Sequence, residues 1–129
     1  VAHGHYYHLF VNWGLCCRGV KSTYRIAIGR SQEITGPYVD RDGRDLREGG
    51  GSPFLGTEGR FIGPGHPAVI REGKDARVSY HFYDGERAGA ATLAVRELEW
   101  DSGGWPVAGP LISPPEAPQE TKPKPPSKP

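Results

Sequence analysis

The chain has 129 residues, which allows one domain at most. Its formal net charge is +1, and the sequence shows no strongly basic face of the kind that binds nucleic acid. No apolar run is long enough to span a bilayer, and no secretory signal opens the chain, which begins at Val1 and contains no methionine. We therefore expect either a processed protein or part of a longer reading frame.

The pattern of apolar residues predicts an all-β fold. Runs that alternate apolar and polar residues are bounded by Gly, Pro, Asp and Asn, and no stretch keeps apolar residues at helical spacing without Gly or Pro. In chain order, strands are expected at residues 5–12, 23–30, 37–40, 66–71, 77–84, 91–100 and 105–107.

These segments form a repeat. A long strand, a loop, a second strand and a short strand occur in residues 5–40 and again in residues 77–107. Residues 66–71 precede the second copy and would be its innermost strand. Repeated four-stranded antiparallel sheets are the blades of a β-propeller, so we expect about two blades, the first lacking an innermost strand that would lie before Val1. The uncovered edge at residues 5–12 could then drive self-association.

The last part of the chain differs in composition. Residues 114–129 contain no aromatic residue and only one aliphatic residue, Ala117. Such a segment cannot bury enough apolar surface to offset the entropy of ordering it. We therefore divide the chain into propeller blades at residues 1–112 and a disordered tail, rich in Pro and Lys, at residues 113–129.

The two cysteines, Cys16 and Cys17, are neighbours in the sequence. Adjacent Cα atoms lie closer together than in ordinary disulfides, so two free thiols are expected and a disulfide ring between neighbours is the lesser alternative. No further ligands stand nearby, which argues against a zinc site.

Three strings carry a resemblance to a known family. They are CCRG-x-x-STY at residues 16–24, GRS-x-x-ITGPYVD at residues 29–40 and G-x-F-IGPGH at residues 59–66. Together they resemble the C-terminal part of endo-α-1,5-L-arabinanases of glycoside hydrolase family 43, over residues 6–107. The resemblance implies a five-bladed β-propeller with an active site at the central axis.

The resemblance also implies inverting hydrolysis of arabinan, which requires an acid and a base carboxyl group on either side of the scissile bond. In the family these groups lie on inner strands that would precede Val1. We therefore expect no catalytic residue in this chain, and we expect the chain alone to be inactive. The family further implies an extracellular or periplasmic enzyme acting on arabinan or arabino-oligosaccharides.

The resemblance points to candidate site residues of two kinds. His66 heads the strand after IGPG and would face a central metal ion, usually calcium or sodium; read from the spacing alone, it is a histidine that packs at a strand start. The loop after the first strand would approach the substrate, through side chains that can also be explained as loop packing. The substrate-binding candidates are Trp13, Cys17, Arg18, Ser22 and Thr23.

Two alternatives to an enzyme fragment remain at this point. A chain that keeps propeller blades without catalytic carboxylates could bind arabino-oligosaccharides without cutting them. It could also assemble with itself through the uncovered blade edge.

Overall fold

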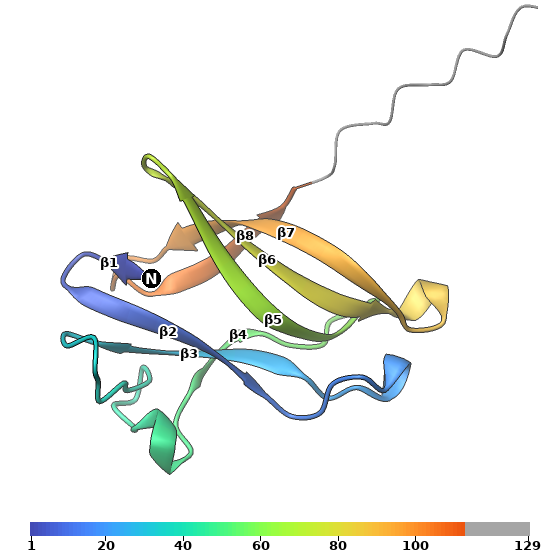
Figure 1. Cartoon of the computed structure of the whole chain (residues 1–129), viewed down its shortest axis with the longest axis horizontal. Helices are drawn as coiled ribbons and strands as arrows, with labels where there is room; N and C mark the ends of the chain where they lie inside the picture. The colour runs from blue at the N-terminus through green and yellow to red at the C-terminus, as the bar shows by residue number, and fades with distance from the viewer. Residues whose placement is uncertain (113–129) are drawn as a thin grey trace, which may run out of the picture.

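A computed structural model describes residues 1–112 as two four-stranded antiparallel sheets, with no α-helix in that range (Figure 1). The all-β prediction is confirmed. The predicted tail lies outside the described residues. The first sheet, sheet A, holds β1 (Ala2–His3), β2 (Tyr6–Trp13), β3 (Arg25–Ser31) and β4 (Ser52–Leu55), and sheet B holds β5 (Phe61–Glu72), β6 (Asp75–Asp84), β7 (Ala90–Trp100) and β8 (Pro106–Leu111). Three short 3₁₀ helices lie in the loops between these strands: η1 (Gly19–Lys21), η2 (Leu46–Glu48) and η3 (Gly85–Arg87).

The inner end of sheet A differs from the prediction. Strand β1 pairs with β2 through Ala2 opposite Tyr7 and His3 opposite Tyr6. The expectation that this blade has no innermost strand after Val1 is therefore wrong. A two-residue strand had no detectable alternation in the sequence, and a tight turn with Gly4 at φ +60° brings it beside β2.

The prediction that residues 37–40 form the outer strand of sheet A is also wrong. In the predicted strand at residues 37–40, only Val39 forms β-bridges, to Arg30 and to Asp45. The outer strand is β4, which pairs with β3. The reason is burial, because Phe54 and Leu55 of β4 pack against the hydrophobic core.

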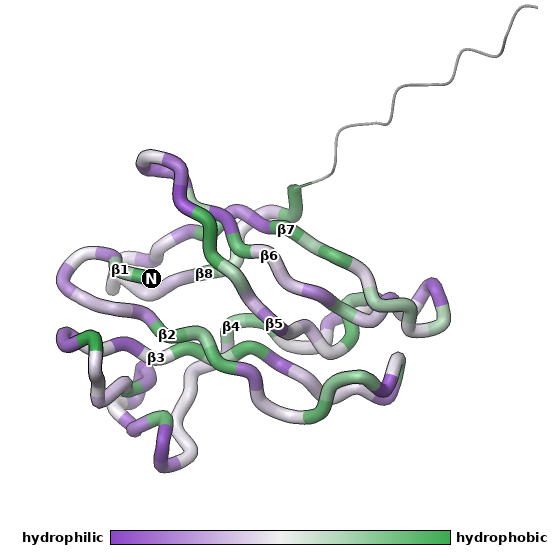
Figure 2. The backbone as a smooth tube through the Cα atoms, in the orientation of Figure 1, coloured by the Kyte–Doolittle hydropathy of each residue, from purple (hydrophilic) through white to green (hydrophobic). Residues whose placement is uncertain are grey.

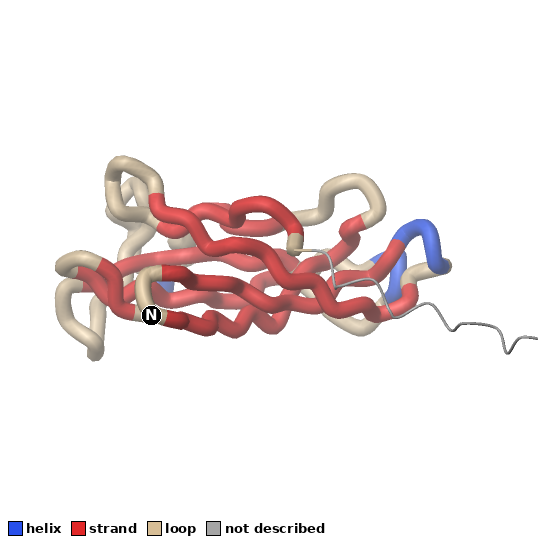
Figure 3. Tube along the Cα trace, turned by 90° about the horizontal axis from the view of Figure 1, so that it is seen from above, coloured by secondary structure: helices blue, strands red, loops and turns tan. Residues whose placement is uncertain are grey.

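The core lies between the two sheets, which lie one above the other in Figure 1 and overlap when they are seen from above (Figure 3). Ile26 of β3 packs with Tyr80 and Phe82 of β6, and all three are almost completely buried. Burying one such side chain contributes roughly 1.5–3 kcal/mol. Strand β5 begins earlier than predicted, at Phe61, whose ring packs at a tilt against that of Phe82 with ring centroids 4.6 Å apart.

Arg30 of β3 links the two sheets. Its guanidinium lies 4.0 Å from the ring centre of Tyr6 and 4.2 Å from that of Trp105. It also donates a 2.8 Å hydrogen bond to the carbonyl of Gly103. A planar cation held between two aromatic rings and a carbonyl fixes one sheet against the other.

Candidate functional site

The loop between β2 and β3, residues 14–24, is held together by its own side chains. The Leu15 amide donates to Thr23 Oγ1 at 3.0 Å, and the Thr23 amide donates to the Leu15 carbonyl at 2.9 Å. The Arg18 amide donates to Ser22 Oγ at 3.0 Å. Two residues predicted to bind substrate, Ser22 and Thr23, therefore support the loop that carries Cys17 and Arg18.

The expectation of two free thiols is wrong, since Cys16 and Cys17 form a disulfide with their Cα atoms 3.8 Å apart. The backbone at Cys17 takes a left-handed φ of 67°, which is uncommon for a residue with a side chain. The ring closes within a single peptide unit. It therefore restricts the loop at the point where the loop turns towards sheet B.

The loop docks on sheet B through three close contacts. The Cys17 amide donates a 2.7 Å hydrogen bond to the hydroxyl of Tyr83, a buried residue of β6. Gly63 allows Ser22 to approach, because a Cβ at position 63 would lie 2.8 Å from Ser22 Cβ. At the tip of the loop, η1 lies beside the turn that follows η3 (Figure 1). A Cβ on Gly89 in that turn would lie only 2.7 Å from the backbone nitrogen of Val20.

Trp13 stands apart from this group. It lines an open hollow of about 390 Å³ over β3 and the loop before β4, and none of the other four substrate-binding candidates is part of its lining. The lining residues are Trp13, Arg25, Ala27, Gly49, Gly50, Gly51 and Pro53.

His66 is exposed and lies in β5 with φ +55°. Its amide donates a 2.9 Å hydrogen bond to Asn12 Oδ1 of sheet A, and its ring centre lies 6.4 Å from that of His81. Within residues 1–112, no group of three or more His, Cys, Asp or Glu side chains is placed to hold a metal ion. Calcium takes six to eight oxygen ligands. These imidazoles do not fit such a site by themselves.

The carboxyl groups with displaced pKa values are all structural. Hydrogen bonds from Arg60 hold the pKa of buried Asp84 below its usual value, and those from Arg47 do the same for Asp45. Backbone amides, that of Gly51 foremost, lower the pKa of Asp40, and the Trp105 amide lowers that of Asp101. A general acid of a glycosidase needs a raised pKa. None of these four carboxyl groups suits that role.

Several residues of this region were missed by sequence reasoning. Tyr83 is a buried residue of β6, and its hydroxyl also holds the loop by accepting the Cys17 amide. Leu15 and Val20 are 52% and 53% exposed on that loop. No local pattern signals these roles, because contacts between β6 and residues 14–24 join distant parts of the chain.

The fold matches solved arabinanases. No family model matches the chain. The structure of Cellvibrio cellulosa α-L-arabinanase matches with a TM-score of 0.81 and 39% identity, over 84% of this chain and 34% of that one. The endo-arabinanase of glycoside hydrolase family 43 from Bacillus licheniformis matches with a TM-score of 0.77 and 42% identity, over 82% of this chain and 36% of that one.

Curated sequences agree. The extracellular exo-α-(1→5)-L-arabinofuranosidase ArbA of Cellvibrio japonicus is 45% identical over 104 residues, which are 80% of this chain and 30% of that protein. The chain belongs to glycoside hydrolase family 43. Its two sheets are therefore blades of the family's five-bladed propeller. This family 43 chain spans about a third of the length of the relatives it matches.

Proposed function

We propose that the chain supplies two neighbouring blades to an arabinan-degrading glycoside hydrolase. The observation that carries this proposal is the loop at residues 14–24. It contains the CCRG string of the resemblance and is held against the next blade by the Cys17–Tyr83 hydrogen bond. The names of the relatives support arabinan as the substrate, and one matching structure is a complex with arabinohexaose.

In this proposal the chain contributes substrate contacts, and other parts of the polypeptide contribute the acid and the base. Arg18 and Cys17 are exposed on the loop, where a guanidinium can donate to sugar hydroxyls. Trp13 offers an aromatic face in the hollow. A calcium or sodium ion at the propeller axis stays a prediction, in which His66 would supply one ligand at most. An extracellular location is proposed because the name of ArbA describes that relative as extracellular.

The proposal is tested with a chimera in which residues 1–112 replace the matching region of the Cellvibrio japonicus relative. We expect the chimera to release arabinose from arabinan. A chimera that folds, as judged by its circular dichroism and cooperative melting, but releases no sugar would contradict the proposal. A second chimera carries Arg18→Ala. We expect its KM to be about tenfold higher than that of the first chimera, the effect of one lost charged hydrogen bond.

A further inference from the structure

We propose that the Cys16–Cys17 disulfide and the Tyr83 hydroxyl together set the shape of a sugar-contacting surface on the loop at residues 14–22, so that this surface is sensitive to reduction. The inference rests on the proposed function for the identity of the ligand, an arabino-oligosaccharide. Tyr83 acts here as a positioning residue, since it touches the loop and not the sugar.

The loop presents apolar side chains next to a charged one at its surface. Leu15 and Val20 are about half exposed, and Cys17 and Arg18 are exposed beside them. Apolar side chains next to a guanidinium suit a sugar ring, whose C–H face packs on apolar atoms while its hydroxyls accept from the fork of N–H groups. A loop surface with this composition is therefore suited to contact an oligosaccharide.

The disulfide and a hydrogen bond to sheet B hold the loop in place. The disulfide fixes the backbone between residues 16 and 17, where φ is 67°. The amide of Cys17 points to sheet B and donates to the Tyr83 hydroxyl at 2.7 Å. The next amide, that of Arg18, donates within the loop to Ser22. The covalent ring and the contact with the next blade thus act on the same peptide unit, the one between Cys16 and Cys17.

The Cys16–Cys17 disulfide can be reduced from solution. Cys17 is exposed and Cys16 is half-buried, so a dithiol can reach the bond. One thiolate of the dithiol attacks a sulfur of the disulfide and forms a mixed disulfide, and its second thiol then displaces the other cysteine. Two electrons pass to the protein, which gains two thiols, and the dithiol becomes a cyclic disulfide. The freed backbone can leave the left-handed conformation, which a residue with a side chain adopts reluctantly.

The experiment uses the whole chain, residues 1–129, with the disulfide intact and after reduction by dithiothreitol. Amide hydrogen exchange of Cys17 and Arg18 is measured by NMR, together with titration by arabinohexaose. We expect the Cys17 amide to exchange at least tenfold faster after reduction and in Tyr83→Phe, with arabinohexaose bound about tenfold more weakly in both, as for the loss of one hydrogen bond and its geometry.

Tyr7→Phe is the matched control. Tyr7 lies in β2 and is partly exposed, and its ring is not part of the loop, so this variant should behave as the wild type. Unchanged protection of the Cys17 amide after reduction and in Tyr83→Phe would overturn the inference. Equal arabinohexaose binding by the oxidised and reduced forms would overturn its link to the ligand. Absence of binding by the oxidised chain would instead contradict the proposed function, while amide exchange would still decide whether the disulfide and Tyr83 hold the loop.

Discussion

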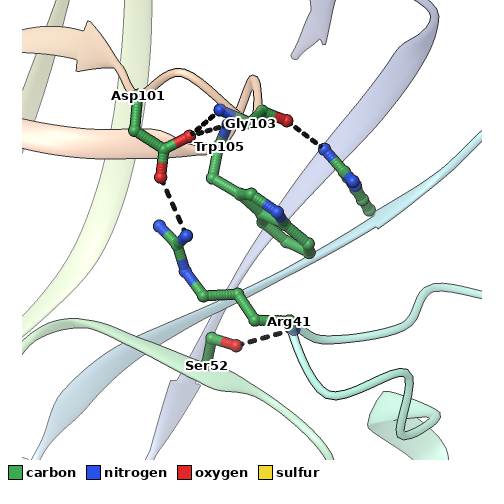
Figure 4. Close-up of polar contacts among 6 residues, drawn as sticks. Arg41, Ser52, Asp101, Gly103 and Trp105 are labelled. Atoms are coloured by element: carbon green, nitrogen blue, oxygen red, sulfur yellow. Dashed lines mark hydrogen bonds and ion pairs between the residues drawn. The ribbon is translucent and has the colours of Figure 1, made fainter.

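Arg41 Nη1 lies 2.8 Å from Asp101 Oδ2, and this ion pair joins the loop before η2 to the turn between β7 and β8 (Figure 4). The other oxygen of Asp101 accepts the amides of Gly103 and Trp105, each at 2.9 Å. One carboxylate therefore holds its own turn and also the neighbouring sheet.

This arrangement predicts unequal effects of removing the two partners. Asp101→Ala should destabilise the fold more than Arg41→Ala does, because the amides of Gly103 and Trp105 lose their acceptor. Arg41→Ala should cost no more than about 1 kcal/mol, since the Arg41 side chain is 40% exposed and such ion pairs are weak. Urea denaturation measures both. Asp101→Asn, which keeps the acceptor oxygen, should resemble Arg41→Ala, and equal losses for Asp101→Ala and Arg41→Ala would contradict the role of the turn.

Gly65 provides a second prediction. A Cβ at this position would lie 2.1 Å from the ring of Tyr24, the last residue of the loop before β3, so Gly65 allows β5 and this loop to approach. Gly65→Ala should destabilise the fold by about 1–3 kcal/mol, the usual effect of overpacking. Gly56→Ala is the control, because a Cβ there meets no atom within 4 Å. Thermal melting of both variants checks the prediction, and similar melting temperatures would refute it.

His8 makes the fold sensitive to pH. The imidazole is 3% exposed, its ring centre lies 5.0 Å from that of Trp100, and neither ring nitrogen has a hydrogen-bond partner among the described residues. Burial, together with repulsion from Arg30 and the N-terminus, lowers the pKa of His8 from 6.5 to about 4. The neutral form is therefore favoured in the fold, and the charged form is favoured in the unfolded chain.

The sign of the pH effect follows from this shift. The stability that neutral His8 provides is complete above pH 6.5 and is lost as the pH falls towards about 4. The loss amounts to at most about 3 kcal/mol. His8→Phe should remove most of this slope between pH 6.5 and 5, where the paired carboxylates still keep their charge. Urea midpoints measured across this range test the prediction, and parallel curves for wild type and variant would exclude it.

The sequence predicted the parts of the fold that depend on local pattern. The alternation at residues 77–84 and 91–100 identified β6 and β7, and Figure 2 shows the apolar stretches along β2, β3 and β7 that carry this signal. It failed where the cause is distant. Strand β4 exists because Phe54 reaches a core built by other segments, and the conformation of Cys17 is held by Tyr83 from the next blade.

The last prediction concerns hydrolysis by the chain alone. Purified residues 1–129 should release no reducing sugar from arabinan, because amides or arginines keep Asp40, Asp45, Asp84 and Asp101 ionised, so that none of the four can donate the proton of the acid. An inverting glycosidase needs one carboxyl group that is protonated at working pH and a second, about 6.5–9.5 Å away, that activates water. The chimera described above serves as the active control. Release of sugar by the chain, abolished by Asp101→Asn or Asp45→Asn in a protein that still folds, would show that these aspartates have a catalytic role after all.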